Sequence, residues 1–133
     1  MDVLASRVLL RPADFAASFD FYTRVLGLHV FREFGSGDAR GAVLFLGGGY
    51  LELSGRCGDT AGHKISLWLQ VRDVDAEHAR LAAAAVTVVE PPVDQPWGLR
   101  EARLLDPDGV LLVLVEIPAT HPLRRDTRSE SNG

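Results

Sequence analysis

The pattern of hydrophobic and polar positions divides the chain into short strands and two helices. Strict alternation of apolar and polar residues is typical of half-buried strands, whereas apolar residues three or four positions apart are typical of amphipathic helices. In the first half this pattern predicts a helix and the strands 6–11, 28–34, 42–46 and 50–54. In the second half it predicts a helix and the strands 64–71, 86–90, 100–105 and 110–116. Each half is therefore predicted to have the order β-α-β-β-β.

Capping residues support both predicted helices. Asp14 precedes the first helix, and Gly27 follows it with the left-handed conformation that commonly ends a helix. The apolar stripe of this helix consists of Phe15, Phe19, Tyr22 and Leu26. Either Asp73 or Asp75 can cap the second helix, whose alanine-rich end has a high helix propensity.

The repeat predicts one domain that covers residues 1–117. Module one would cover 1–55 and module two 64–117, joined by a short polar, glycine-bearing linker at 56–63. Residues 118–133 lose the apolar periodicity, so they are predicted to form a flexible tail.

Composition and charge exclude several classes of function. The 133 residues carry a formal net charge of -4 with scattered basic residues, so binding to nucleic acid or to an anionic membrane is not expected. The single cysteine, Cys57, excludes an internal disulfide and fits a reducing compartment. No apolar run approaches the roughly 20 residues of a membrane span, and no basic leader begins the chain. The sequence thus predicts a soluble cytoplasmic protein, and its basic residues, nearly all arginine, suggest a GC-rich bacterial genome.

Glu52 is an unexpected residue for the interior of a short apolar strand, because an ionised carboxylate is costly to bury. Alternation places Leu51 and Leu53 on the helix-packed face and leaves Tyr50, Glu52 and Ser54 on the other face. In "ISLWLQV", Ser66, Trp68 and Gln70 likewise share one face. A mixture of aromatic and polar side chains is typical of a small-molecule cavity.

Two motifs, in this order, resemble a known family. The pattern S-x-x-FY-x-x-x-LG occupies Ser18–Gly27, and "DPDG" occupies Asp106–Gly109. With the repeated β-α-β-β-β order, they make the chain, up to about residue 117, resemble the vicinal oxygen chelate superfamily. That superfamily includes glyoxalase I, extradiol dioxygenases, fosfomycin resistance enzymes and bleomycin resistance proteins. The resemblance implies an α+β fold in which two βαβββ modules form a curved mixed sheet with a concave binding cleft, and it implies a homodimer.

The resemblance also implies where a metal would bind. The four ligand positions of the metal-dependent members fall on Arg7, Glu52, Ser66 and Val113. Only Glu52 is a suitable ligand, and a guanidinium beside it opposes a cation. We therefore expect no metal cofactor and predict that Glu52 forms a charge-assisted pair with Arg7. The alternative is a divalent ion such as Zn, Ni, Mn or Fe.

Other candidate catalytic groups are weaker. A different register could bring His63 near Ser66, but its strand parity is opposite and a surface position is favoured. Cys57 has no visible activating base, so an ordinary loop thiol is favoured. Glu52 could act as a general base in a metal-free enzyme.

The remaining pattern favours binding over chemistry. The segment "QPWG-x-R" at 95–100 is similar to the drug-binding branch of the superfamily, and Trp68 and Trp97 could stack on heteroaromatic rings, although both could instead be core aromatics. The predicted ligand-binding residues are Arg7, Leu9, Tyr50, Glu52, Ser66, Trp68, Gln70, Trp97, Arg100 and Val113. The sequence predicts metal-free sequestration of an antibiotic-type small molecule, aromatic or, given the acidic balance, cationic. The alternative is a metal-dependent lyase, isomerase or dioxygenase.

Overall fold

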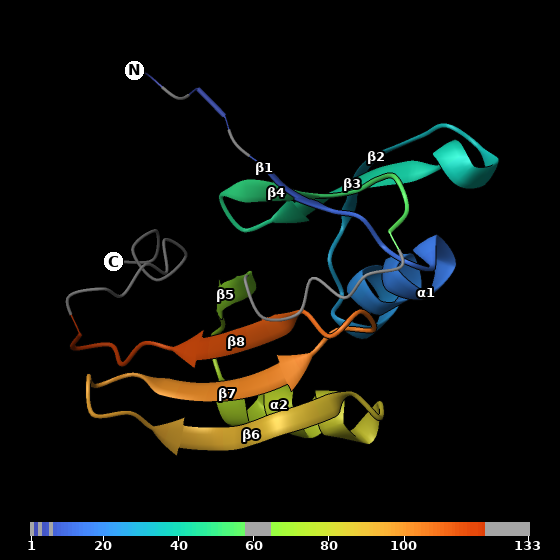
Figure 1. The fold of residues 1–133 in the computed structure, drawn as a ribbon. Helices are drawn as coiled ribbons and strands as arrows, with labels where there is room; N and C mark the ends of the chain where they lie inside the picture. Colours follow the sequence, from blue (N-terminus) through green and yellow to red (C-terminus); the bar gives the residue numbers. More distant parts are fainter. Residues whose placement is uncertain (1, 3, 6, 58–64, 122–133) are drawn as a thin grey trace. The chain divides into compact units, whose positions relative to one another are not determined.

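The computed structural model describes residues 2, 4–5, 7–57 and 65–121, whose strands form two separate four-stranded sheets (Figure 1). The chain divides into two compact units. Unit 1 comprises Met1–Ile65 and Leu105–Val110, and unit 2 comprises Ser66–Leu104 and Leu111–Gly133.

Unit 1 contains four strands and one helical segment that covers one face of their sheet. The elements are β1 (Arg7–Leu10), α1 (Phe15–Asp20), the π-helical turn η1 (Phe21–Val25), β2 (Val30–Phe34), the 3-10 turn η2 (Gly37–Ala39), β3 (Gly41–Leu46) and β4 (Gly49–Leu53). The strand order is β1-β4-β3-β2, with β1 parallel to β4 and the other neighbours antiparallel.

Unit 2 repeats this arrangement. Its elements are β5 (Ser66–Gln70), α2 (Val74–Ala83), β6 (Thr87–Asp94), β7 (Arg100–Leu105) and β8 (Leu111–Glu116). The strand order is β5-β8-β7-β6, and β5 is parallel to β8 as β1 is to β4. The repeated βαβββ order confirms the fold class predicted from the sequence.

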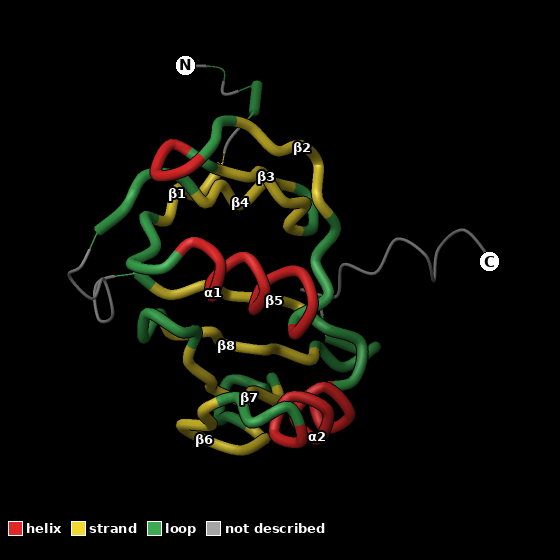
Figure 2. Tube along the Cα trace, turned by 90° about the vertical axis from the view of Figure 1, so that its right-hand side faces the viewer, coloured by secondary structure: helices red, strands yellow, loops and turns green. Residues whose placement is uncertain are grey.

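The core of unit 1 lies between the sheet and α1, which runs beneath the strands in Figure 2. Leu44, Leu51 and Leu53 have no exposed surface, and Phe15 and Tyr22 from the helical segment are buried with them. Burial of about five such side chains contributes several kcal/mol, since each is worth roughly 1.5–3 kcal/mol. The predicted helix-packed positions Leu51 and Leu53 are confirmed.

The helices begin as predicted, but the first one continues differently. The Asp14 carboxylate accepts a hydrogen bond from the Ala17 N–H at 3.2 Å, and the Asp73 carboxylate accepts one from Ala76 at 3.0 Å. Asp73, and not Asp75, is therefore the cap of α2. The helix predicted to stop at Gly27 continues after Asp20 as the wider π-helical turn η1, and Gly27 has the expected left-handed conformation with φ of 84°.

Strand β6 is longer than predicted. It was expected to end at Glu90 but continues through Pro91 and Pro92 to Asp94. Proline lacks an N–H, but β6 is an edge strand with only one neighbour, so the missing donors interrupt no inner pairing.

The compact units do not coincide with the predicted modules, since unit 1 extends to Ile65 although module two was expected to begin at 64. Leu105–Val110 was expected within module two at 64–117, yet the structure groups it with unit 1. Residues 58–64, which hold most of the expected linker and His63, and residues 122–133 of the expected tail lie outside the described residues. Among the helices described, none is long and apolar enough to cross a membrane.

Candidate ligand-binding site

The face of the unit 1 sheet opposite α1 carries the polar and aromatic residues predicted from alternation. The register pairs Leu9 with Glu52 and Glu52 with Val43 across three strands, so these side chains share one face. Tyr50 and Phe45 are a second cross-strand pair on this face. We call it the open face of unit 1, because Leu9 and Phe45 are exposed on it although Val43 between them is buried.

Arg7 and Glu52 form the predicted pair on this open face. The Arg7 Nη1 donates to Glu52 Oε1 at 2.7 Å, and the Ser54 hydroxyl donates to Oε2 at 2.8 Å. The Ser54 hydrogen bond, followed by that of Arg7, holds the pKa of Glu52 below its usual range. Glu52 is therefore ionised, and each of its carboxylate oxygens already accepts a hydrogen bond.

Three aromatic rings gather on the same open face: Phe31, Phe45 and Tyr50. The centroid of Phe31 lies 5.2 Å from that of Phe45 and 5.2 Å from that of Tyr50, while Phe45 and Tyr50 are 5.7 Å apart. These are favourable distances for aromatic pairs. Phe31 and Phe45 nevertheless remain 49% and 43% exposed, so this aromatic cluster presents a large apolar surface.

A β-bulge in β2 adds Phe31 to the aromatic cluster. Val30 pairs with Leu44 and Arg32 with the adjacent Val43, so Phe31 is the extra residue between two successive pairs. A bulge of this kind redirects a side chain relative to simple alternation. Neither Phe31 nor Phe45 is among the ligand-binding residues predicted from the sequence. Phe45 could have been found as the partner of Tyr50 across the glycine turn, but the bulge leaves no signal in the sequence.

Unit 2 also exposes aromatic residues away from its core. Trp68 is 53% exposed on β5, opposite the nearly buried Val113 of β8. Val113 packs in an apolar cluster with Leu99, Val115 and Ile117. Ser66 is exposed and Gln70 half-buried on the Trp68 side of β5. The predicted face is therefore present, and Val113 is an apolar residue beside Trp68 on this face.

Trp97 is exposed but held in position by a buried carboxylate. Its indole N–H donates to Glu101 at 2.7 Å while the residue remains 55% exposed. Glu101, only 4% exposed, also accepts from Arg103 at 3.1 Å, and Arg103 donates to Glu90 at 3.2 Å. The interpretation of Trp97 as a core aromatic is wrong.

The guanidinium of Arg100 is already engaged in ion pairs, unlike that of a residue available to bind a ligand. Its guanidinium donates two hydrogen bonds to Asp75 of α2 at 2.8 and 2.9 Å and a third to Asp94 at 3.1 Å. These carboxylates raise its pKa and hold it against α2. We therefore leave Arg100 out of the candidate site.

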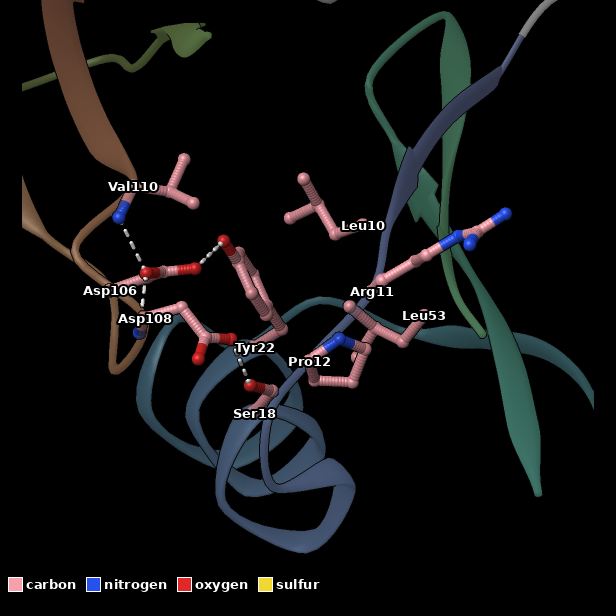
Figure 3. Close-up of a pocket in the computed structure, with 9 residues that line it drawn as sticks. All are labelled: Leu10, Arg11, Pro12, Ser18, Tyr22, Leu53, Asp106, Asp108 and Val110. Carbon is pink, nitrogen blue, oxygen red and sulfur yellow. Dashed lines mark hydrogen bonds between the residues drawn. The ribbon is translucent and has the colours of Figure 1, made fainter. Parts of the chain in front are cut away.

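The two family motifs contact each other inside unit 1, away from the open face (Figure 3). The hydroxyl of the fully buried Tyr22 donates to Asp106 at 2.7 Å, and Asp106 also accepts from the backbone N–H groups of Asp108 and Val110. Ser18 donates to Asp108 at 3.3 Å. Burial raises the pKa of Tyr22 and of Asp106. The small pocket at these residues has room for a water-sized group only, so we assign the motifs a structural role.

The residues at the expected metal positions do not fit a metal. They supply one carboxylate already bound by two donors, the Arg7 guanidinium, a serine hydroxyl and the Val113 side chain. Unit 2 contains a separate acidic group, in which one carboxylate oxygen from each residue lies within 4.8 Å of the other two: Asp73, Asp75 and Glu116. Asp73 caps α2, Glu116 accepts from the first N–H of the helix, and Asp75 pairs with Arg100. Structural hydrogen bonds therefore account for this cluster.

Comparison with known proteins identifies the family. Residues 5–114 match the model of the Glyoxalase/Bleomycin resistance protein/Dioxygenase superfamily, and the chain belongs to this superfamily. No curated protein matches the sequence.

Solved structures agree with that assignment. A superfamily member from Sphaerobacter thermophilus is 25% identical over 86% of this chain and 98% of its own, with a TM-score of 0.74. TioX from Micromonospora sp. ML1 is 28% identical over 86% of this chain and 98% of its own, with a TM-score of 0.71. TnmS3, an antibiotic binding protein from Streptomyces sp. CB03234, is 24% identical over 88% of this chain and 98% of its own, with a TM-score of 0.75.

Proposed function

We propose that this protein binds and sequesters an aromatic small molecule of the antibiotic type, without a metal and without chemical conversion. The observation that carries the proposal is the aromatic cluster of Phe31, Phe45 and Tyr50 on the open face of unit 1. Large aromatic side chains are costly to leave in water, and a contiguous exposed group of them is typical of a binding site. A planar ring system stacked on this cluster would cover the exposed surface.

The chemistry of the neighbouring residues supports binding over catalysis. Glu52 is ionised, but its two carboxylate oxygens already accept hydrogen bonds from Arg7 and Ser54. It is therefore a poor general base. The residues at the metal positions do not fit a divalent ion, which argues against the metal-dependent lyase, isomerase or dioxygenase. The structural similarity to TnmS3, an antibiotic binding protein, supports the same choice.

Unit 2 offers a second stacking surface in this proposal. Trp97 is held by Glu101 while its ring stays exposed, and Trp68 is exposed on β5. Side chains fixed before binding lose little conformational entropy when a ligand arrives. We include a homodimer in the bacterial cytoplasm in the proposal, as the resemblance and the composition imply.

Calorimetric titration with planar aromatic compounds, bleomycin and divalent metals tests the proposal. We expect at least one aromatic compound to bind and Phe45→Ala to weaken that binding about 5- to 100-fold, because stacking on one ring is worth roughly 1–3 kcal/mol. Val89→Ala, which truncates an exposed residue of β6, is the control and should bind normally. Elemental analysis should find no stoichiometric metal. A tightly bound metal that is lost in Glu52→Ala would contradict the proposal.

A further inference from the structure

The open face presents arginine hydrogen-bond donors together with the Tyr50 hydroxyl, which can donate or accept. The Arg7 side chain is 40% exposed and that of Glu52 only 15%. Arg7 uses Nη1 for Glu52, and among the described residues its Nε and Nη2 have no partner. Arg7 pairs with Tyr50 across β1 and β4, so a molecule on the aromatic cluster would meet the N–H groups of Arg7, while the Glu52 carboxylate is already bound.

A second arginine increases the positive character of this face. Arg32 follows the bulge residue Phe31, pairs with Val43 and is exposed. Because Val43 of β3 pairs with Arg32 on one side and with Glu52 on the other, Arg32 lies on the same face as the Arg7–Glu52 pair. Its charge is one of the causes that lower the pKa of Glu52. Two guanidinium groups thus accompany one carboxylate on this face, although the whole chain is acidic.

We propose that the ligand is a planar aromatic compound that carries an anionic oxygen group, such as a carboxylate or an ionised phenol, and that Arg7 binds this group. The inference rests on the proposed function and differs from the sequence prediction in the charge of the ligand: the acidic composition favours a cationic ligand, but the local groups favour an anionic one. A guanidinium matches a carboxylate with two parallel hydrogen bonds, and the free Nε and Nη2 of Arg7 form such a fork. The aromatic cluster then supports the ring system.

Arg7 is held in place by Glu52 and Ser54. Because Glu52 accepts from both groups, it anchors the Arg7 guanidinium through Nη1 and leaves the opposite edge for the ligand. Glu52 is a positioning residue in this arrangement.

The test uses three probes that share one ring system: anthraquinone-2-carboxylate, the neutral anthraquinone-2-carboxamide and a cationic trimethylammoniomethyl anthraquinone. For the natural protein at low salt we expect the carboxylate to bind about 10-fold more tightly than the carboxamide, and the cation to bind most weakly. Arg7→Gln should abolish the carboxylate's advantage and leave the affinity for the carboxamide unchanged. Arg24→Gln, which removes an exposed arginine paired with Asp20, is the matched control and should keep the advantage.

The salt dependence of binding is the second part of the test. Raising NaCl from about 50 to 500 mM should reduce the carboxylate's advantage, since screening weakens partly exposed ionic contacts. Equal binding of all three probes, or a preference for the cation, would overturn this inference and leave the proposed function standing. Failure of every probe and every antibiotic to bind would overturn both.

Discussion

Tyr22 and Asp106 explain why the two motifs occur together in the sequence. Asp106 is largely buried and accepts hydrogen bonds from one hydroxyl and two backbone N–H groups. Such a carboxylate is costly to bury without all of its donors. The motifs therefore mark a buried hydrogen-bonded contact inside unit 1, which we call the joint, and not the ligand-binding residues. They are reliable evidence for the fold but carry no information about the ligand.

Removing the Tyr22 hydroxyl tests this joint. Tyr22→Phe should lower the free energy of unfolding by about 1–3 kcal/mol, because it leaves the buried Asp106 one donor short. Tyr50→Phe is the matched control: the Tyr50 hydroxyl has no hydrogen bond among the described residues, so the change should be within about 0.5 kcal/mol. Urea unfolding measures both. Equal losses for the two variants would contradict the structural role of the joint.

Strands β2 and β3 show how one element shapes the candidate site. The bulge at Phe31 directs its ring toward Phe45 and Tyr50, and Phe34, further along β2, covers Gly41 at the start of β3. Gly41 is needed here because of a close approach and not because of an unusual backbone angle. A Cβ at this position would lie against the Phe34 ring and 2.9 Å from the backbone carbonyl oxygen of Leu53.

An alanine at Gly41 should therefore destabilise the sheet. We expect Gly41→Ala to cost about 1–3 kcal/mol, since neither the ring nor the backbone of β4 can move without disturbing the pairing. Gly48→Ala, where a Cβ meets nothing within 4 Å, should change stability by no more than about 0.5 kcal/mol. Thermal unfolding of the two variants provides the comparison. A neutral Gly41→Ala would show that β2 and β3 are less tightly packed than the structure indicates.

The two compact units share the chain in a way that couples their folding. Leu105–Val110 belongs to unit 1, whereas the strands on either side of it, β7 and β8, lie almost entirely in unit 2. Loss of unit 1 would release the turn that joins these strands. We therefore expect the two units to unfold in one transition.

Tyr22→Phe also tests this coupling. Both tryptophans, Trp68 and Trp97, lie in unit 2, so their fluorescence reports that unit, while circular dichroism reports both units. The substitution in unit 1 should lower the Tm seen by both probes equally, by about 5 °C or more for the expected loss. A tryptophan transition that stays at its original temperature would show that the units unfold independently.

Local pattern was enough to predict much of the fold. Alternation and helical periodicity predicted the two βαβββ halves and the burial of Leu51 and Leu53, because these depend on neighbours close in the sequence. The resemblance to the superfamily placed Arg7 and Glu52 at one site and so predicted their pairing, which the 2.7 Å contact confirms. The role of Tyr22 could not be predicted, since its partner Asp106 is 84 residues away.

The sequence by itself determined the order of the elements and the face on which Glu52 lies, and its motifs indicated the family that the comparison identifies. Only the tertiary structure decided which aromatic residues gather beside Glu52. It also decided that Arg100 is held against α2 while Trp97 stays exposed, and that the open face of unit 1 presents arginine donors. The physical reason is that alternation fixes the face of a residue, whereas a bulge, a cross-strand register or a distant ion pair fixes its neighbours. Those neighbours determine the charge and shape that a ligand meets.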